Sequence, residues 1–406
     1  MHAGRPRDTL LLAAGGWTGS GVERGALPIH AGRMAATAAA ASPRIDLRDH
    51  LVFPGLINAH EHLHVNAVPP LRAEAPFANS YAWIEAFRAH FAEPAVIAAL
   101  TVPKPLRLRH GALKNLLAGT TCVVHHDSWH AALEAADFPV ALLRDAHWSY
   151  ALAGPGYGPP VQASFTATPP HRPWMIHLAE GTDATAQAEL AELDRLGCLA
   201  ANSVLVHGVG LSRRDTERVI AAGAAVVWCP GSNRALLGRT LDPRRLCAAG
   251  RLMLGTDSRL SGERDLLEEL RLAVDCYGLQ PQQLLGLVTT DAARLLHLPE
   301  RGHLAPGAHA DLVIVEDRGG DPLRSLLGIA RSQVRAVVRD GAPRIADPDF
   351  AHWFAALGID ALPVMLDGRP KLIDSALADD ALFALEPGLS ADAVAQAPWL
   401  AAAGAH

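Results

Sequence analysis

The stretch that decides the fold is Phe53-Pro54-Gly55-Leu56-Ile57-Asn58-Ala59-His60-Glu61-His62-Leu63-His64. An apolar run from Val52 to Ile57, broken by Pro-Gly and followed by histidines, is typical of a buried strand that opens onto a site. Because side chains alternate along an extended strand, we expect His60 and His62 to point to one side and Glu61 to the other. Two imidazoles on one face can bind one metal ion, and histidine suits zinc or iron better than calcium or magnesium. A bare pair at this spacing is more often solvated or packed, so the interpretation depends on the rest of the chain.

Composition narrows the class of protein. The chain has 406 residues, half of them hydrophobic, which is enough for one large core and a smaller domain. A net charge of −6, with no basic cluster interleaved with aromatics, argues against a nucleic-acid partner. The five cysteines are scattered and never spaced as Cys-x-x-Cys, which indicates packing thiols in a reducing compartment. Without a leader-like segment or about 18 consecutive apolar residues, we expect no membrane span and a cytoplasmic location.

Short β-like segments occur at both ends of the chain, from residue 8 to 45 and again after residue 300, and we expect them to close one small β domain together. Between them, short apolar runs alternate with alanine-rich amphipathic segments, which predicts a parallel sheet covered by helices. The expected divisions are 1–52 and 300–345 for the two parts of the β domain, 53–299 for the helix-covered barrel, and 346–406 for a C-terminal extension.

Polar residues end several of the predicted strands. Residues 174–178 carry His177, with Glu180 three positions later, residues 203–207 end in His207, and residues 252–255 lead to Asp257. In a barrel of parallel strands the C-terminal strand ends converge on one face. We therefore expect these residues to meet His60 and His62. One such residue is usually structural, but five at strand ends are harder to dismiss, namely His60, His62, His177, His207 and Asp257.

The ordered set of motifs resembles the amidohydrolase superfamily, in particular its cytosine deaminase, guanine deaminase and chlorohydrolase-like branch. The motifs are Pro54-Gly55-Leu56-Ile57-Asn58-Ala59-His60-Glu61-His62, Gly119-Thr120-Thr121, His177-Leu178-Ala179-Glu180, His207, Cys229-Pro230-Gly231-Ser232-Asn233, Gly255-Thr256-Asp257 and Gly302-His303-Leu304-Ala305-Pro306-Gly307. The resemblance implies an α/β fold, a distorted (β/α)8 TIM-type barrel with a small β-sandwich built from both chain ends. It also implies one catalytic metal ion bound by His60, His62, His177 and Asp257.

The lysines sharpen the metal expectation. Binuclear members of the superfamily bridge two metals with a modified lysine between the first histidine pair and the next ligand histidine. This chain has only Lys104, Lys114 and Lys371, and none lies between His125 and His177. We expect one divalent ion, with Zn²⁺ first and Fe²⁺ as the alternative. The sequence does not separate the two metals, because availability and second-shell tuning decide which one is loaded.

The resemblance also implies roles for the other polar residues. Glu180 is expected to be the acid/base group that protonates the ring nitrogen under attack and then the leaving amine, with a surface carboxylate as the alternative. Asp257 would bind the metal and orient the attacking water. His207 would polarise the substrate or steady the hydroxide, with a further metal ligand as the alternative.

Three features depart from the family pattern. Only about 50 residues separate His126 from His177, whereas a βα unit takes roughly 30, and we can assign only a strand at 140–143 and a Gly/Pro-rich loop at 154–173. A strand or helix is therefore expected to be missing or irregular, leaving the barrel up to one βα unit short. Trp228 stands where the family often has histidine, and the tail after residue 347 has no counterpart.

Substrate contacts are predicted from position alone. The segment from Val65 to Ala89, expected to form a lid, offers Asn66 and Trp83, whose ring could stack on a planar substrate or pack within the lid. Arg259, two residues after Asp257, could pair with a carboxylate or phosphate of the substrate. The alternative is a surface salt bridge to Glu263 or Asp265. His126, at the end of the second strand, is expected to border the pocket.

Three functions remain open. Hydrolytic deamination of a small N-heterocycle or cyclic amidine by a metal-bound hydroxide is favoured, because Glu180 can supply the proton that an amine leaving group needs. Hydrolysis of an amide, ring C–N or C–halogen bond in the same site is the alternative, and ammonia release separates the two. A non-catalytic binding protein on the barrel is the third. The expected partners are a small-molecule substrate and a second copy of the chain, since homodimers are common in the family.

Overall fold

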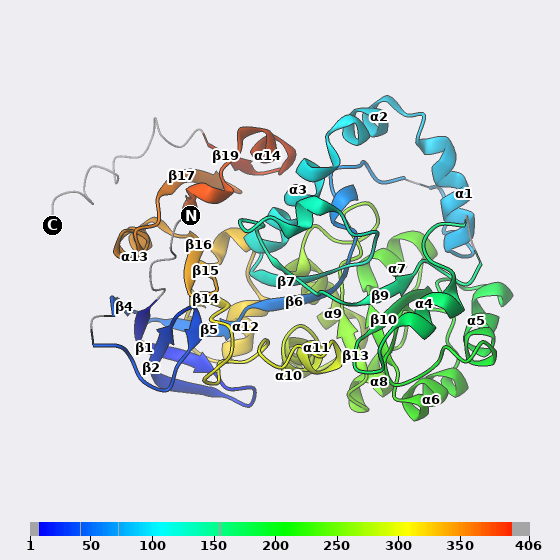
Figure 1. The fold of residues 1–406 in the computed structure, drawn as a ribbon, viewed down its shortest axis with the longest axis horizontal. Coiled ribbons are helices and arrows are strands. Elements are labelled where there is room, and N and C mark those ends of the chain that lie inside the picture. The colour runs from blue at the N-terminus through cyan, green and yellow to red at the C-terminus, as the bar shows by residue number, and fades with distance from the viewer. Residues whose placement is uncertain (1–7, 41, 72, 154–155, 392–406) are drawn as a thin grey trace.

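The computed structural model describes residues 8–391, apart from residues 41, 72, 154 and 155. Strands from the two chain ends lie together on one side of the molecule, and parallel strands covered by helices lie on the other (Figure 1). None of the helices described is both long enough and apolar enough to cross a membrane.

Both ends of the chain contribute to one eleven-stranded sheet. Its centre is the antiparallel pair of β5 (His50–Pro54) and β14 (Leu312–Glu316), which joins residues more than 250 positions apart. The outermost strands on the C-terminal side come from the predicted extension after residue 346, so those strands continue the sheet. The other strands are β1 (Thr9–Trp17), β2 (Val22–His30), β3 (Arg33–Met34), β4 (Arg44–Asp46), β15 (Ala336–Arg339), β16 (Ala342–Ala346), β17 (Ala361–Leu366), β18 (Arg369–Asp374) and β19 (Leu389–Ser390).

Gly55 divides the apolar run that the sequence suggests is one strand. β5 ends at Pro54 and pairs within the eleven-stranded sheet, whereas β6 (Leu56–Glu61) pairs in parallel with β7 (Thr120–His125). A Cβ atom at Gly55 would lie 2.2 Å from Oγ1 of Thr121, so a side chain has no room at this crossing. One short segment therefore connects the sheet of the chain ends to the strands that carry the site.

Eight parallel strands form the second part of the molecule, in a three-stranded and a five-stranded sheet. The sheets meet where Glu61 of β6 bridges to Asp257, whose carbonyl accepts a hydrogen bond from the His62 N–H at 2.7 Å. Among the described residues no strand pairing joins β8 to β9, so hydrogen bonds do not close the ring there. The remaining strands are β8 (Ala141–Leu142), β9 (His147–Ser149), β10 (Trp174–Leu178), β11 (Ser203–His207), β12 (Ala225–Trp228) and β13 (Leu252–Leu254).

The short region before His177 contains a strand that the sequence analysis did not assign. β9 lies between the predicted strand and the predicted loop, and α4 (Val161–Ala167) lies within that loop, whose residues 154 and 155 are outside the described part. The missing element is a helix between β8 and β9, because residues 143–146 are too few for a helical crossover. The eight parallel strands therefore have one irregular connection, and a strand of three residues has too little periodicity to be predicted.

Alternation along β10 shows how the strands point their side chains. Trp174, Ile176 and Leu178 pack with the leucines of α5 (Ala184–Arg195), and Met175 packs with residues from both sheets. Because side chains alternate, His177 shares the inward face with Met175. This alternation therefore determines which side chains at the C-terminal end of each strand share the inward face.

The other helices cover the strands or form the lid. Residues 281–295 form two helices with a break between them, and the break frees the carbonyl of Val288 to accept the N–H of Ile57 in β6 at 2.8 Å. The bounds are α1 (Ser80–His90), α2 (Pro94–Thr101), α3 (Lys104–Leu117), α6 (Arg213–Ala222), α7 (Pro230–Leu237), α8 (Arg244–Ala248), α9 (Leu266–Tyr277), α10 (Pro281–Leu287), α11 (Thr290–Leu295), α12 (Pro322–Leu327), α13 (Ala351–Leu357) and α14 (Asp380–Leu385).

Candidate active site

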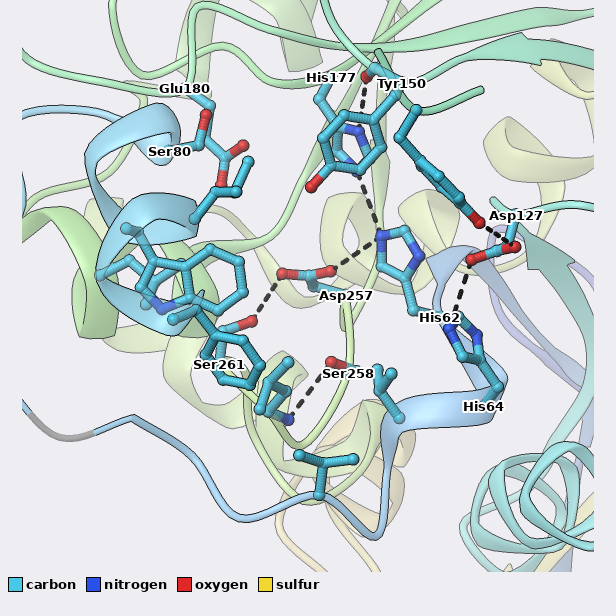
Figure 2. A pocket seen from close by; sticks show the side chains of 18 of the residues that line it. His62, His64, Ser80, Asp127, Tyr150, His177, Glu180, Asp257, Ser258 and Ser261 are labelled. Carbon is cyan, nitrogen blue, oxygen red and sulfur yellow. Dashed lines mark hydrogen bonds and ion pairs between the residues drawn. The ribbon is translucent and has the colours of Figure 1, made fainter. Parts of the chain in front are cut away.

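The four residues predicted to bind metal come together at the C-terminal ends of β6, β10 and β13. Nε2 of His60 and Nε2 of His62 lie 3.4 and 3.5 Å from Oδ1 of Asp257, and Nε2 of His62 lies 3.2 Å from Nε2 of His177. Figure 2 shows His62, His177 and Asp257 pointing toward one another. Sequence positions far apart therefore supply one cluster of nitrogen and oxygen donors.

The spacing of these donors fits a metal ion. Ligand atoms about 2.1 Å from a tetrahedral zinc ion stand about 3.4 Å apart, and the three separations in the cluster are 3.4, 3.5 and 3.2 Å. Nε2 of His60 is buried and has no hydrogen-bond partner among the described residues. A divalent cation is the group that this donor set would accommodate.

Backbone carbonyls at the end of β9 fix the tautomers of two of the histidines. Nδ1 of His177 lies 2.8 Å from the carbonyl of Tyr150, and Nε2 of His126 lies 3.1 Å from the carbonyl of Ser149. A carbonyl only accepts, so each of these nitrogens carries the proton. Nδ1 of His126 then accepts from Nδ1 of His60 at 3.3 Å. Nε2 of both His60 and His177 is left with a free lone pair, as a metal ligand requires.

Burial keeps these rings neutral. It lowers the pKa of His60 to about 4 and holds the pKa of His126 and His177 well below the ordinary value of 6.5. A neutral imidazole is the form that binds a metal ion. Free lone pairs of neutral rings thus face the Asp257 carboxylate, an arrangement that a cation between them stabilises.

Three residues of the site adopt the left-handed backbone conformation without being glycine. Ala179, His207 and Asp257 have φ angles of 53°, 77° and 60°. Each such residue costs about 1–3 kcal/mol of strain, which persists only where the surrounding structure enforces it. The chain therefore turns sharply immediately after β10, at the end of β11 and after β13, where the polar side chains leave the strands.

Glu180 and His207 form a second pair beside the donors. Nε2 of His207 lies 3.5 Å from Oε1 of Glu180, and its Nδ1 donates to Oδ1 of Asn233 at 2.8 Å. The amide of Asn233 is oriented by donating to Oγ1 of Thr240, which also accepts from Nε1 of Trp228. Burial raises the pKa of Glu180, which favours the protonated form. Trp228, a departure from the family pattern, thus helps to orient His207.

Two serines orient Asp257. The hydroxyls of Ser232 and Ser261 donate to Oδ2 at 2.7 and 2.6 Å, which leaves Oδ1 facing His60 and His62. Neither serine is among the site residues predicted from the sequence. Ser232 lies in the motif at residues 229–233 and could have been found from it, whereas Ser261 belongs to no motif in the sequence.

Glu61 points away from the site, as predicted, into a polar cluster behind β6. A shift in the pairing of β6 with β7 between Asn58 and Glu61 lets both side chains face α3. Glu61 accepts hydrogen bonds from Lys114 at 2.7 Å, from Asn115 at 3.0 Å and from Thr256 at 2.9 Å. We name this set the Glu61 cluster.

A cavity of about 540 Å³ opens over the donors. Of the four residues predicted to contact substrate, Trp83 lies on its wall. The described residues that line it are largely apolar or aromatic and include Val65, Val68, Trp83, Ile84, Phe87, Phe91, Leu100, Tyr150, Tyr157, Leu236 and Leu260, with the site residues His62, His177, Glu180, His207 and Asp257.

The other three predicted contacts lie off the cavity wall. His126 sits behind His60, as described above. The amide of Asn66 donates to Glu61 at 3.2 Å, and its oxygen accepts from Lys114 and from the N–H of Arg259. Both terminal nitrogens of Arg259 donate to Glu386 at 2.8 Å, so its partner is a buried residue of the C-terminal extension. These side chains support the site from outside the cavity.

Comparisons with known proteins agree with this arrangement. Residues 166–343 match the model of the Amidohydrolase family. The chain is 26% identical over 386 residues to 8-oxoguanine deaminase of Pseudomonas aeruginosa, covering 75% of this chain and 84% of that protein. It is 27% identical over 381 residues to 5-methylthioadenosine/S-adenosylhomocysteine deaminase of Nitratidesulfovibrio vulgaris, covering 77% and 84%.

Solved structures share the fold. An adenosine deaminase from Xanthomonas campestris with bound zinc superposes with a TM-score of 0.66 at 22% identity, covering 87% of this chain and 98% of the other. Atrazine chlorohydrolase from Arthrobacter aurescens in complex with zinc gives a TM-score of 0.65 at 18% identity, covering 86% and 100%. These likenesses indicate a (β/α)8-type barrel.

Proposed function

We propose that this chain, whose residues 166–343 match the Amidohydrolase family, is a metal-dependent hydrolase that deaminates a small N-heterocycle or cyclic amidine. The single observation that carries the proposal is Glu180, a buried carboxyl with a raised pKa, 3.5 Å from His207 and on the wall of the cavity. An amine leaves only after it has received a proton, and burial that raises the pKa of a carboxyl lets it keep a proton to a higher pH and so suits it to supply one.

His60, His62, His177 and Asp257 would hold the metal, Zn²⁺ or alternatively Fe²⁺. A bound divalent metal lowers the pKa of water from 15.7 to about 7 and so supplies a nucleophile at neutral pH. Zinc suits three imidazoles and a carboxylate at these separations. The two proteins of similar fold named above were crystallised with zinc, which supports the choice.

The side chains around the metal would divide the remaining work. Asp257, with Oδ2 held by the two serine hydroxyls, would present Oδ1 to orient the attacking water. Glu180 would deliver its proton to the ring nitrogen, take up the proton of the attacking hydroxyl group, and pass that proton to the leaving amine. His207, whose Nδ1 proton is committed to Asn233, would use Nε2 to accept a hydrogen bond from the protonated Glu180 or from water.

The cavity suits a planar, weakly charged substrate. Trp83, Phe87 and Tyr150 provide ring faces on its wall, and aromatic faces bind flat heterocycles by stacking. Arg88, the one guanidinium on the described wall, is already paired with Glu85 at 2.6 Å. A neutral heterocycle fits this lining better than a substrate with a carboxylate or phosphate.

Hydrolysis of a C–halogen, amide or ring C–N bond is the second candidate. The metal donors and Glu180 would serve that reaction equally, and the apolar wall and the fold shared with atrazine chlorohydrolase favour it as an alternative. The two candidates differ in the leaving group.

The test is a panel of aminopurines, cyclic amidines and chloro- and aminotriazines, assayed with zinc-loaded protein for both ammonia and chloride. We expect ammonia release, reduced about 10²–10⁴-fold in Glu180→Gln with the zinc content unchanged. Chloride release without ammonia would replace deamination by the second candidate. Tight binding of panel members without turnover would favour a non-catalytic binding protein.

A further inference from the structure

A second group of side chains with metal-binding chemistry lies beside the candidate active site. One imidazole nitrogen of His64, one of His125 and a carboxylate oxygen of Asp127 all lie within 4.8 Å of one another. His64 lies in the 3₁₀ turn Leu63–Val65 after β6, whereas the other two lie at and just beyond the end of β7. None of the three is a predicted ligand of the first metal, so the donor set is separate.

One separation within this group equals a separation in the first site. Nε2 of His64 lies 3.4 Å from Oδ2 of Asp127, the same separation as between Nε2 of His60 and Oδ1 of Asp257. This is close to the distance of about 3.4 Å between two ligand atoms of a tetrahedral zinc ion. Figure 2 shows His64 and Asp127 facing each other on the cavity wall.

Asp127 is oriented for the role. Its Oδ1 accepts from the hydroxyl of Tyr157 at 2.6 Å and from the N–H of Ser128 at 2.5 Å, which leaves Oδ2 toward His64. Lys104 lies 3.9 Å from Oδ1, on the oxygen that is already engaged, and its side chain is one-third exposed. The lysine therefore neutralises part of the charge without occupying the face turned to the histidines.

His125 has a ring nitrogen without a hydrogen-bond partner among the described residues. His125 is only 9% exposed, and its Nε2 is buried without a hydrogen-bond partner among the described residues. Its Nδ1 has only a long contact of 3.4 Å, from the N–H of Leu63. Buried polar atoms are nearly always paired, and an unpaired one carries a free-energy penalty. A bound cation would remove that penalty.

We propose that His64, His125 and Asp127 form a second binding site for a divalent cation of the zinc type. Two imidazoles and one carboxylate are a ligand set that zinc takes, with one position left open. Because His64 and Asp127 line the cavity, the open position faces the space where a substrate lies. A cation there places positive charge beside the first site, where it attracts an electron-rich group of the substrate.

The test is zinc stoichiometry. Apoprotein of the full chain is titrated with ZnCl₂ by calorimetry, and bound metal is counted by elemental analysis after dialysis against a low concentration of ZnCl₂. The expected result is two zinc ions per chain, falling to one in His64→Ala and one in Asp127→Asn. His177→Ala should lose the other ion and retain this one, so the two sites are counted separately whatever the enzyme's activity.

Two controls keep the outcome clear. Asp127→Asn is nearly isosteric with the wild type and should fold. It therefore tests the site even if circular dichroism shows that His64→Ala does not fold. His352→Ala removes an exposed histidine far from both sites in sequence and should leave two ions bound. One ion per wild-type chain at saturating ZnCl₂, or two ions in Asp127→Asn, would overturn the proposal.

Discussion

Two buried polar clusters lie on opposite faces of the same strand, β6, and they differ in how their charges are balanced. In the Glu61 cluster the carboxylate receives hydrogen bonds from Lys114, Asn115 and Thr256, and the ammonium of Lys114 supplies the opposite charge. In the other cluster Nε2 of His60 faces the carboxylate of Asp257 at 3.4 Å without a hydrogen bond. Burial is similar, because Glu61 and His60 are both completely inaccessible to solvent.

The difference separates a cluster that stabilises the folded chain from a cluster that can bind a metal ion. Buried polar groups are stable only when they are paired, and the Glu61 cluster is paired within the protein itself. Although burial opposes ionisation of Glu61, the charge of Lys114 and the hydrogen bonds together lower its pKa. The histidine cluster has free lone pairs and a carboxylate but no cation of its own. We therefore expect mutations in the first cluster to change stability and mutations in the second to change metal binding.

The largest expected effect is in the second cluster. Asp257→Asn removes the negative charge that the metal needs while keeping the shape of the side chain. We expect loss of the zinc ion held by the histidine cluster and a fall in kcat/KM of about 10³-fold or more, corresponding to several kcal/mol of metal-dependent stabilisation. Elemental analysis and kinetics measure both, and the thermal unfolding of the zinc-free protein should stay close to wild type. A variant that bound as many zinc ions as the wild type would contradict the assignment of Asp257 as a ligand.

Breaking the Glu61 cluster should lower the stability of the protein and leave its zinc binding unchanged. Lys114→Met leaves a buried carboxylate without its counter-charge, so we expect a loss of about 3–5 kcal/mol in the free energy of unfolding. Urea denaturation of the zinc-free protein measures it. Arg195→Met, which removes a cation from an exposed ion pair, is the matched control and should leave the midpoint unchanged. If Lys114→Met lost zinc but kept its stability, the division between the clusters would fail.

A third buried carboxylate tests whether internal pairing is general. Glu386 accepts from His110, Arg259 and Arg331, and although burial opposes ionisation these partners hold its pKa far below the ordinary value. A lowered folded-state pKa stabilises the protein above the unfolded value of about 4.3, and that contribution is lost as the pH falls further. We expect Glu386→Gln to lose about 1–3 kcal/mol near pH 7.

The pH dependence supplies the check. Wild-type stability should fall on acidification below about pH 4.5, and the Glu386→Gln variant should show a shallower fall over the same range. The measurement is the urea midpoint between pH 7 and pH 3, with the zinc-free protein at constant ionic strength. Parallel curves for the two proteins would mean that Glu386 does not contribute to acid sensitivity.

The site can also be perturbed without touching a ligand. His126→Phe removes the nitrogen that accepts the Nδ1 proton of His60, so His60 is no longer held in the tautomer that leaves Nε2 free. We expect zinc affinity to fall about 10–100-fold, as for other second-shell partners. Chelator competition measures it, and His126→Asn, which keeps an acceptor near the same place, should recover part of the affinity. Equal losses in both variants would point to packing instead of the tautomer.

These predictions also show where sequence reasoning ends. His60, His62, His177 and Asp257 could be predicted because each lies at the end of a recognisable apolar strand. The carbonyls of Ser149 and Tyr150 could not, because a backbone carbonyl has no side-chain signature and β9 is only three residues long.

Pairing over long distances was equally hidden from the sequence. Arg259 had nearby carboxylates as candidate partners, yet it pairs with Glu386, 127 positions away. The partner lies in the extension for which no family counterpart was found. The sequence position of Arg259 suggested a substrate contact, but its pairing with Glu386 in the folded chain determines its role.

The smallest expected effect concerns the cavity wall and separates binding from chemistry. Trp83 belongs to neither cluster, but its ring lines the cavity and lies tilted beside that of Phe87, with ring centroids 5.1 Å apart. Trp83→Leu keeps an apolar side chain and removes the flat face, so we expect KM for a heterocyclic substrate to rise about 3–10-fold, with kcat and zinc content nearly unchanged. Trp129→Leu, which changes an exposed tryptophan, is the matched control. A fall in kcat with constant KM would mean that the α1 segment positions the reacting groups instead of binding the ring, and would connect the lid to the histidine cluster.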